Sequence, residues 1–313
     1  PAAGAVAVPL RSSTGTFSSK SSIAVRAFAF GEATIDREWL TKGIAEAGER
    51  RALMGYGPKT DTTGYRVVFG EADNLPGLVI DRFGDTVVFQ ISTAGLDAMR
   101  DDVIAAIKKV LRPECLIERS DMPVRAEEGL KDVVKVHVGT ADELVPFTER
   151  GVKFLADPVK GQKTGFFLDQ KDARAALAGL AEGRNVLNLF SYSGAAGVAM
   201  MLGGARSVHN VDASADALDL CRKHAELHDL SVKKFTVEEA DIFQWLGAGQ
   251  EKKYDMVVMD PPALIKTMKE AEEGRKAYHF LNRAAMRLVA APEQGDSGPG
   301  APPRGAGHRL GLV

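Results

Sequence analysis

Strand and helix patterns alternate along residues 185–260, and this alternation constrains the fold more than any other feature of the chain. Short apolar runs predict strands at residues 185–190, 207–213, 234–240 and 254–260, and amphipathic runs predict helices from residue 194 and over 214–228 and 242–247. Such alternation favours a parallel sheet wrapped by helices, whose ligands bind beyond the carboxyl ends of the strands. We expect an α/β domain over residues 151–290.

The preceding segment has a different order of elements. A helix is predicted over residues 35–54, followed by a linker rich in Gly, Pro and Thr. Strands are expected at 65–71 and 77–92, a helix at 95–111, and strands at 115–121 and 133–139. This strand-strand-helix-strand-strand pattern predicts a small α+β domain, which together with the linking helix occupies residues 32–150.

Composition excludes several classes of protein. With 40 basic and 42 acidic residues the formal charge is -2, so that a nucleic-acid site must be a local patch. No apolar run approaches the ~18 residues of a membrane span, so no membrane partner is expected. The two cysteines, Cys115 and Cys221, lack metal-ligand spacing, which argues against zinc or any other metal and favours a reducing, cytoplasmic setting. Residues 1–31 contain three basic residues and no acid, which leaves an organellar transit peptide as the alternative.

The ends of the predicted strands carry the candidate site. Gly194 stands where a strand becomes a helix, which allows close approach of a ligand, but only Gly194 and Gly197 are present, too few for a dinucleotide fingerprint. Asp212 ends the second strand and either accepts the hydroxyls of a ribose or caps the next helix. Asp241, past the third strand, either meets an adenine or is a solvated loop acid.

The fourth strand ends at Asp260, Pro261 and Pro262. The prolines fix the backbone there, so that Asp260 is expected to hold a planar base, although a simple strand-ending turn is the alternative interpretation. Taken together, the four strand ends describe a site for an adenosyl ligand without phosphates. The predicted cofactor is therefore S-adenosyl-L-methionine (SAM), with the target base beside its methyl group.

Several longer segments carry a family resemblance. They are EADNLPGLVIDRFGD (71–85), IERSDMPVRAEEGL (117–130), TGFFLDQKDAR (164–174), VLNLFSYSGAAGVAMMLGGA (186–205) and the run of thirty residues that begins at DPPALIK (260–289). These segments closely resemble the bacterial 23S ribosomal RNA 5-methylcytosine methyltransferase family, of the large-subunit methyltransferase I type. The resemblance implies a PUA RNA-binding domain, the α+β domain, and a Rossmann-like class I SAM-dependent methyltransferase domain. Residues 1–31 resemble only the last strands of the PUA domain and are expected to be a remnant of it.

The resemblance also implies roles for individual residues. Asp260 would meet the target base and the cofactor, with Pro261 and Pro262 as its rigid support. Ala173 departs from the family, which usually has Asn there. The residues implied to bind the cofactor are Thr164, Gly165, Phe166 and Asp169 on its methionine side, Asn188, Phe190, Ser191, Tyr192, Ser193 and Gly194 at its floor, Asp212 and Ala213 at the ribose, and Asp241 and Ile242 at the adenine.

Methylation of cytosine at C5 requires a cysteine thiolate that adds to C6 of the base. In the resembled family this cysteine lies in a segment like L-V-T-x-S-C-S, whereas here the resemblance stops after Val289 and residues 291–313 form a Gly- and Pro-rich tail that is expected to be disordered or aberrant. Cys221 is spaced with Leu218 and Ala225 on a buried helix face, and Cys115 opens a strand, so both are expected in the core.

The functional expectation is a SAM-dependent RNA methyltransferase that forms 5-methylcytosine in large-subunit ribosomal RNA, its expected partner. Two alternatives stay open. One is methylation of a base nitrogen, which needs no cysteine, and the other is a cofactor- or RNA-binding protein without activity. A homodimer is also left open by the sequence.

Overall fold

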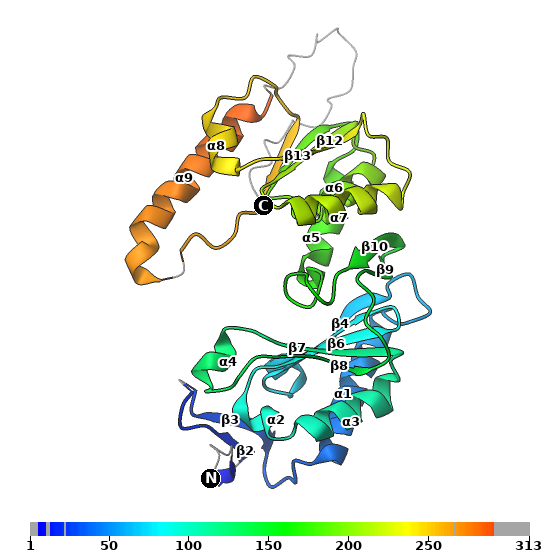
Figure 1. Ribbon diagram of the computed structural model, residues 1–313, viewed down its shortest axis with the longest axis vertical. Helices are drawn as coiled ribbons and strands as arrows, with labels where there is room; N and C mark the ends of the chain where they lie inside the picture. The colour runs from blue at the N-terminus through cyan, green and yellow to red at the C-terminus, as the bar shows by residue number, and fades with distance from the viewer. Residues whose placement is uncertain (1–5, 11–12, 22, 266, 291–313) are drawn as a thin grey trace, which may run out of the picture. The chain divides into compact units, whose positions relative to one another are not determined.

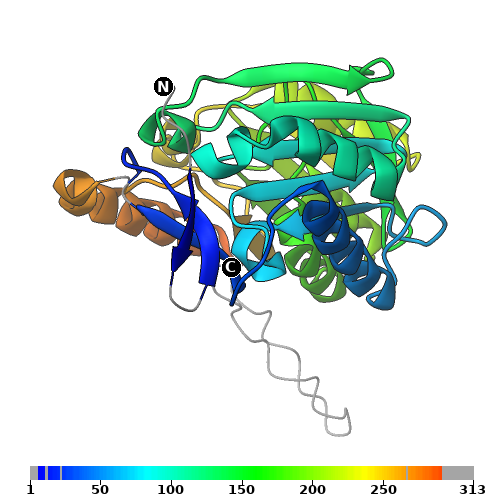
Figure 2. The ribbon, with the colours of Figure 1, turned by 90° about the horizontal axis from the view of Figure 1, so that it is seen from below.

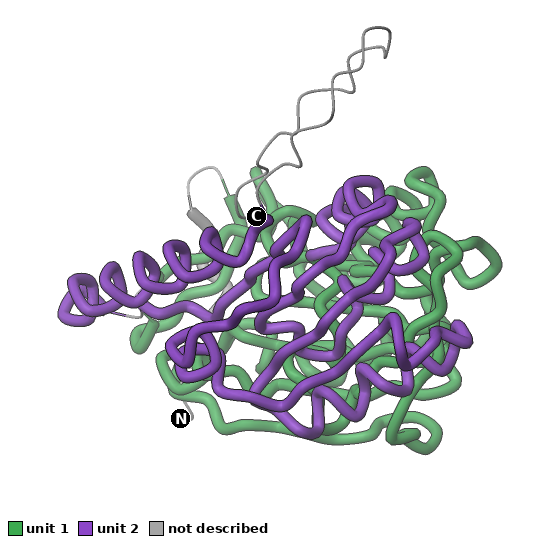
Figure 3. The backbone as a smooth tube through the Cα atoms, turned by 90° about the horizontal axis from the view of Figure 1, so that it is seen from above, with its two compact units in different colours: residues 1–169 green, residues 170–313 purple. Residues whose placement is uncertain are grey.

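The computed structural model describes residues 6–10, 13–21, 23–265 and 267–290. The chain divides into two compact units, residues 1–169 and 170–313, which Figure 3 colours separately. The sequence places the start of the methyltransferase domain earlier, at residue 151. The tail predicted to be disordered, residues 291–313, lies outside the described residues.

Unit 1 is built around a five-stranded sheet of order β4-β5-β6-β7-β8 (Figure 1). Neighbouring strands are antiparallel except for β6 and β7, which are parallel and connected by helices. The strands are β4 (Gly64–Phe69), β5 (Leu78–Phe83), β6 (Thr86–Ile91), β7 (Cys115–Ser120) and β8 (Val133–Val138). The helices and turns among them are η1 (Gly70–Asp73), α2 (Ala94–Asp97), α3 (Arg100–Leu111) and α4 (Val124–Glu127).

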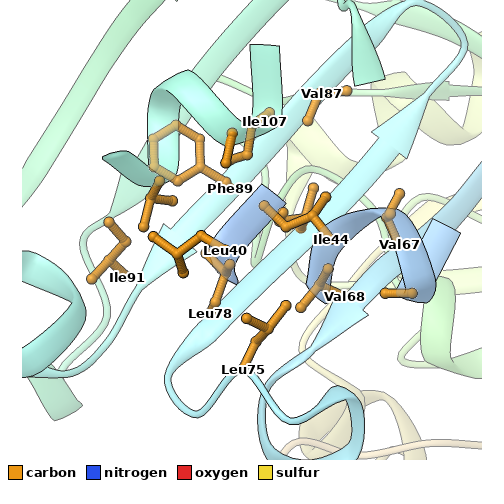
Figure 4. Close-up of a cluster of buried hydrophobic side chains, with 14 of the residues drawn as sticks. Leu40, Ile44, Val67, Val68, Leu75, Leu78, Val87, Phe89, Ile91 and Ile107 are labelled. Atoms are coloured by element: carbon orange, nitrogen blue, oxygen red, sulfur yellow. The ribbon is translucent and has the colours of Figure 1, made fainter. Parts of the chain in front are cut away.

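Helix α1 (Arg37–Leu53) covers one face of this sheet beside α3, as Figures 1 and 2 show. Its first turn is capped by Asp36, whose Oδ1 accepts a hydrogen bond from the Trp39 N–H at 2.9 Å. Leu40 and Ile44 lie one helical turn apart and are fully buried among strand residues such as Val67 (Figure 4). The predicted helix over residues 35–54 is confirmed, and its apolar stripe forms the core of unit 1.

Two predicted segments of unit 1 are each divided. Residues 77–92, expected as one strand, form the hairpin β5-β6, because Gly84 adopts a left-handed backbone (φ +57°) that turns the chain back. The sheet therefore has one strand more before its helix than the pattern predicts. The helix expected over 95–111 is interrupted at Met99, whose backbone (φ −106°, ψ 18°) lies outside the helical region.

The beginning of unit 1 is a three-stranded antiparallel sheet of order β1-β2-β3. A separate hairpin, β9-β10, ends the regular part of the unit. These strands are β1 (Val6–Leu10), β2 (Ser13–Phe17), β3 (Val25–Phe30), β9 (Val145–Glu149) and β10 (Val152–Ala156).

Unit 2 contains the predicted parallel sheet, in the order β13-β12-β11-β14. All its pairs are parallel, so that the four strands end at one edge. The strands are β11 (Asn185–Leu189), β12 (Ser207–Asp212), β13 (Phe235–Glu239) and β14 (Met256–Met259). The helices and turns are η2 (Leu168–Gln170, which crosses the unit boundary), α5 (Lys171–Leu180), α6 (Ala195–Leu202), α7 (Ala215–Glu226), α8 (Ile242–Gly247), η3 (Met268–Glu270) and α9 (Ala271–Leu288).

The two faces of this sheet are covered by different helices. Leu187 and Val211 point to the face where α8 and α9 pack, together with Trp245 and Leu281. Because side chains alternate along a strand, Asn210 faces the opposite side, towards α6. Helices cover both faces and leave the carboxyl edge of the strands for the candidate site. Among the described residues, no helix is sufficiently long and apolar to span a membrane.

Candidate cofactor and base site

The chain makes a strained turn where it leaves β11. Phe190, Tyr192 and Gly194 all have positive φ, at +56°, +47° and +68°. For bulky residues such as Phe and Tyr this backbone is unfavourable by about 1–3 kcal/mol each, and it persists only where the surroundings enforce it. One restraint is the Tyr192 N–H, which donates to Asp212 Oδ2 at 2.7 Å. The structure thus joins the turn of residues 190–194 to the end of the next strand.

Gly194 has no space for a side chain. A Cβ atom built there would lie 2.1 Å from Sγ of Cys221, on helix α7. The glycine predicted from sequence is therefore required both by its left-handed backbone and by this close approach. Helix α6 begins immediately after it, with its first N–H groups at the carboxyl edge of the sheet.

Both carboxylate oxygens of Asp212 accept hydrogen bonds from backbone N–H groups. Its Oδ2 accepts from Tyr192, and its Oδ1 accepts from the Ser214 N–H at 2.9 Å. The cap of α7 is Ser214, whose Oγ accepts from the Ala217 N–H, so the helix-cap alternative for Asp212 is wrong. Each carboxylate oxygen has a second lone pair, which leaves Asp212 able to accept ligand hydroxyls. Ala213 beside it is exposed.

Asp241 follows β13 and is adjacent to Asp212, since the Ala240 N–H donates to the Asp212 carbonyl at 2.9 Å. It is the N-cap of α8: its Oδ1 accepts from the Gln244 N–H at 2.9 Å. Sequence reasoning missed this capping role, although an acid directly before a helix is its usual signal. The Ile242 side chain is buried in the core, so that only its backbone is available to a ligand.

Asp260 is exposed just beyond β14, in front of Pro261 and Pro262. Its Oδ2 accepts a hydrogen bond from Gln170 Nε2 at 2.5 Å. Sequence analysis did not single out Gln170, although it ends the quoted TGFFLDQ motif. The acid is thus held both by its backbone and by an amide donor from a segment ninety residues away.

Asn188 is directed away from the strand edge. Its Nδ2 donates to Asn210 Oδ1 at 2.9 Å, and both side chains are buried. A Cβ on Gly197 would lie 2.2 Å from that Asn210 oxygen, so the asparagine pair lies beneath helix α6. Asn188 therefore supports the sheet and α6 through its side chain. Its partner Asn210 was missed because nothing local distinguishes it from other strand residues.

Both cysteines are buried, which confirms the core interpretation. Burial raises the pKa of Cys221 to about 12; the charge of Arg222 opposes this effect and that of Asp212 adds to it. Burial, reinforced by the charge of Asp142, also raises the pKa of Cys115. The thiolate is the nucleophilic form, so neither residue is suited to attack a base. Among the described residues, no cluster of three or more His, Cys, Asp or Glu side chains is arranged to hold a metal ion.

Comparison with known proteins decides the family. Residues 132–289 match the family described as S-adenosylmethionine-dependent methyltransferase. A "Ribosomal RNA large subunit methyltransferase I" from Aeromonas hydrophila is 41% identical over 88% of this chain and 70% of the relative. The protein of the same name from Serratia proteamaculans is 37% identical over the same shares. The chain belongs to the ribosomal RNA large subunit methyltransferase I family. The predicted resemblance is confirmed.

Solved structures agree with this family assignment in their fold. A SAM-dependent methyltransferase from Streptococcus mutans has a TM-score of 0.76 and 24% identity, covering 89% of this chain and 71% of that one. A methyltransferase complexed with SAH has the same TM-score and identity. The Rossmann-like class I fold is therefore confirmed, and SAM is the cofactor of the family to which the chain belongs.

The turn of residues 190–194 has a polar group available to bind such a cofactor. Ser191 Oγ is buried and has no hydrogen-bond partner within the described part of the chain. A buried hydroxyl without a partner costs about 1–3 kcal/mol, which a polar ligand would recover. Ser191 lies between Phe190 and Tyr192, so that an unsatisfied donor and a strained backbone occur in the same turn.

The predicted residues on the methionine side of the cofactor belong to unit 1. Thr164 Oγ1 donates to Asp81 Oδ2 at 2.6 Å, and Asp81 is in turn paired with Arg66 at 2.8 Å. Gly165 has φ +119°, and a Cβ there would lie 2.6 Å from the Asp157 carbonyl oxygen. The hydroxyl of Thr164 and the absence of a side chain at Gly165 thus shape this loop.

Phe166 and Asp169 complete the loop. The Phe166 ring is 2% exposed and packs edge-on against Phe147, with ring centroids 4.9 Å apart. Asp169 is exposed and pairs with Lys163 Nζ at 2.7 Å. Burial opposes ionisation of Asp169, but the hydrogen bond and charge of Lys163 outweigh it and lower its pKa. Of the four residues, only Asp169 presents an exposed polar side chain.

Proposed function

We propose that this protein is a SAM-dependent methyltransferase whose site takes a cytosine of large-subunit ribosomal RNA for methylation at C5, with SAM bound at the carboxyl edge of the sheet in unit 2, and that the thiol this reaction needs is missing from the 313 residues. The observation that carries the substrate class is the 41% identity to a relative named for large-subunit ribosomal RNA. Asp260 supports a base substrate, because an exposed carboxylate beside a rigid Pro-Pro backbone can accept from an amino group. The cytosine N4 amino group is such a donor.

The cofactor would be held by three adjoining strand ends. Bound SAM supplies an electrophilic methyl group. We propose that the turn of residues 190–194 offers Ser191 Oγ and backbone N–H groups, that Asp212 and Ala213 meet the ribose, and that Asp241 and the Ile242 backbone meet the adenine. Thr164, Gly165, Phe166 and Asp169 would order the loop on the methionine side, and Asn188 would support the floor from beneath α6.

The proposed contact between Asp212 and the ribose can be tested directly. We expect Asp212→Ala to weaken SAM binding by roughly 1.5–3 kcal/mol, the range for a hydrogen bond to a charged group. The measurement is isothermal titration calorimetry. Asp216→Ala is the matched control, because Asp216 is an exposed acid in the first turn of α7 and should leave affinity unchanged. Equal affinity of wild type and Asp212→Ala would remove Asp212 from the site.

The C5 reaction also requires a thiolate that adds to C6 of the base and leaves again when the C5 proton is removed. The burial of Cys115 and Cys221 speaks against either as this nucleophile. The same observation favours a second candidate function, methylation of a base nitrogen, whose lone pair needs no covalent help. Asp260 would still orient the base in that reaction.

Nucleoside mass spectrometry separates these candidates. Unmodified ribosomal RNA is incubated with the protein and labelled SAM, digested, and analysed for labelled nucleosides. Labelled 5-methylcytosine from a variant that carries an accessible thiol at the sheet edge supports the C5 proposal, and a labelled N-methylpurine from the unaltered chain supports the nitrogen alternative. Bound SAM with no labelled nucleoside is expected for a protein that binds cofactor or RNA without activity.

A further inference from the structure

A fully buried histidine lies directly behind the turn of residues 190–194. His224, on α7, is 0% exposed, and its Nδ1 lies 2.8 Å from the carbonyl oxygen of Ser193. Ser193 is itself buried, at 3% exposure. Because a carbonyl oxygen only accepts hydrogen bonds, Nδ1 must carry the hydrogen and donate it. This contact therefore places a hydrogen on Nδ1 of His224.

The peptide group between Ser193 and Gly194 is held at both of its ends. Its carbonyl accepts from His224, and its N–H, on Gly194, donates to the Ser191 carbonyl at 2.8 Å. Rotation of this peptide unit would break both bonds. It would also change φ of Gly194, which now stands at +68°.

The turn depends on such restraints. Phe190 and Tyr192 are strained by their positive φ, and hydrogen bonds to neighbouring elements help to keep them in place. β12 supplies one set, through the Val211 carbonyl that accepts from the Ser191 N–H at 3.2 Å and through Asp212. His224 supplies another from α7, on the Ser193 side of the turn. These two sets of hydrogen bonds hold different peptide groups of the turn, so one set cannot replace the other.

We propose that His224 is a positioning residue for cofactor binding, which acts by fixing the Ser193–Gly194 peptide from behind. It rests on the proposal above that SAM binds at this turn. His224 does not touch the cofactor in this role. Its donor keeps Ser191 Oγ and the first N–H groups of α6 in the arrangement that receives SAM, so that binding does not have to bear the cost of ordering the turn.

Two substitutions separate the donor from the volume of the ring. His224→Leu keeps a buried side chain of similar size but has no donor, and we expect it to weaken SAM binding by about tenfold to a hundredfold, because the Ser193 carbonyl loses its partner. His224→Asn places an amide N–H near the position of Nδ1, and we expect its dissociation constant to stay within about threefold of wild type. Both are measured by calorimetry on the 313-residue chain.

His209→Leu is the matched control. His209 also belongs to a polar network, with Tyr254 Oη at 2.8 Å and Glu238 at 2.9 Å, and neither of these partners belongs to the turn of residues 190–194. We expect this variant to lose thermal stability without losing SAM affinity. A purely structural role for His224 would make His224→Leu behave in the same way.

A measurement on the wild-type protein covers the case in which His224→Leu does not fold. Ring ¹⁵N chemical shifts should show a hydrogen on Nδ1 of His224, protected from solvent exchange. A hydrogen-free Nδ1 would overturn the proposal, as would a folded His224→Leu that binds SAM like wild type, or a His224→Asn that binds as weakly as His224→Leu. If wild type itself did not bind SAM, the proposed function would fail first.

Discussion

The 313-residue chain is expected to bind SAM but to form no detectable 5-methylcytosine in unmodified ribosomal RNA. Its sequence contains two cysteines, and both are buried. Burial raises the pKa of Cys221 to about 12, so that at pH 7 it is a neutral thiol and not the nucleophilic thiolate. Calorimetry with SAM and nucleoside mass spectrometry test the two halves of this expectation. Robust 5-methylcytosine formation, abolished by Cys115→Ala or Cys221→Ala, would contradict it.

The structure indicates where an added thiol would restore the reaction. Val289 pairs with Tyr254 in parallel, the Tyr254 N–H donates to the Leu288 carbonyl at 2.9 Å, and the Ala290 N–H donates to the Tyr254 carbonyl at 2.8 Å. A strand continued from Val289 in this register would reach the level of Asp260 at position 295, because Asp260 is six residues beyond Tyr254.

We therefore expect activity from a variant in which a strand-forming segment replaces residues 291–313 and carries a cysteine at the sheet edge. Cysteine is placed at position 294 in one variant and at position 295 in another, since adjacent strand residues point to opposite faces. Labelled 5-methylcytosine should appear with one placement and be absent with alanine at the same position. Activity at both placements, or with alanine, would exclude the added thiol as the nucleophile.

Gly194→Ala is expected to have the largest effect of any single substitution near the site. The new Cβ would lie 2.1 Å from Cys221 Sγ, and alanine at φ +68° is strained as well. Together, the left-handed backbone and the overpacking should lower the free energy of unfolding by about 2–5 kcal/mol and abolish measurable SAM binding. Urea denaturation and calorimetry measure the two effects.

Gly183→Ala is the matched control for this prediction. Gly183 has the same φ of +68°, but a Cβ there would meet nothing within 4 Å. Gly183→Ala should lower the free energy of unfolding only by the cost of a left-handed backbone at alanine, about 1–2 kcal/mol, and should leave SAM affinity unchanged. Adding Cys221→Ala to Gly194→Ala removes the Sγ contact and should restore part of the stability. If Gly183→Ala and Gly194→Ala lowered the free energy of unfolding equally, the contact with Cys221 would not contribute to the destabilisation.

Local patterns in the sequence were sufficient for the order of elements in unit 2. The strands β11 to β14 and the helices between them lie where period and flanking residues predicted them, because these signals depend only on near neighbours. The hairpin β5-β6 was read as one strand, since both halves are apolar and Gly84 is a single weak signal. The burial of Cys221 followed from its spacing on an amphipathic helix.

The sequence by itself determined the family, the cofactor and the parallel sheet, because these depend on ordered motifs and periodicity. Only the tertiary structure decided which polar groups are used to hold the chain itself: Thr164 bonds to Asp81, Asn188 to Asn210, and His224 to Ser193. It also brought Gln170 to Asp260. The physical reason is that a hydrogen bond requires its donor and acceptor within about 3 Å, and for residues far apart in the chain that distance is set by the packing of the whole unit, which no local pattern encodes.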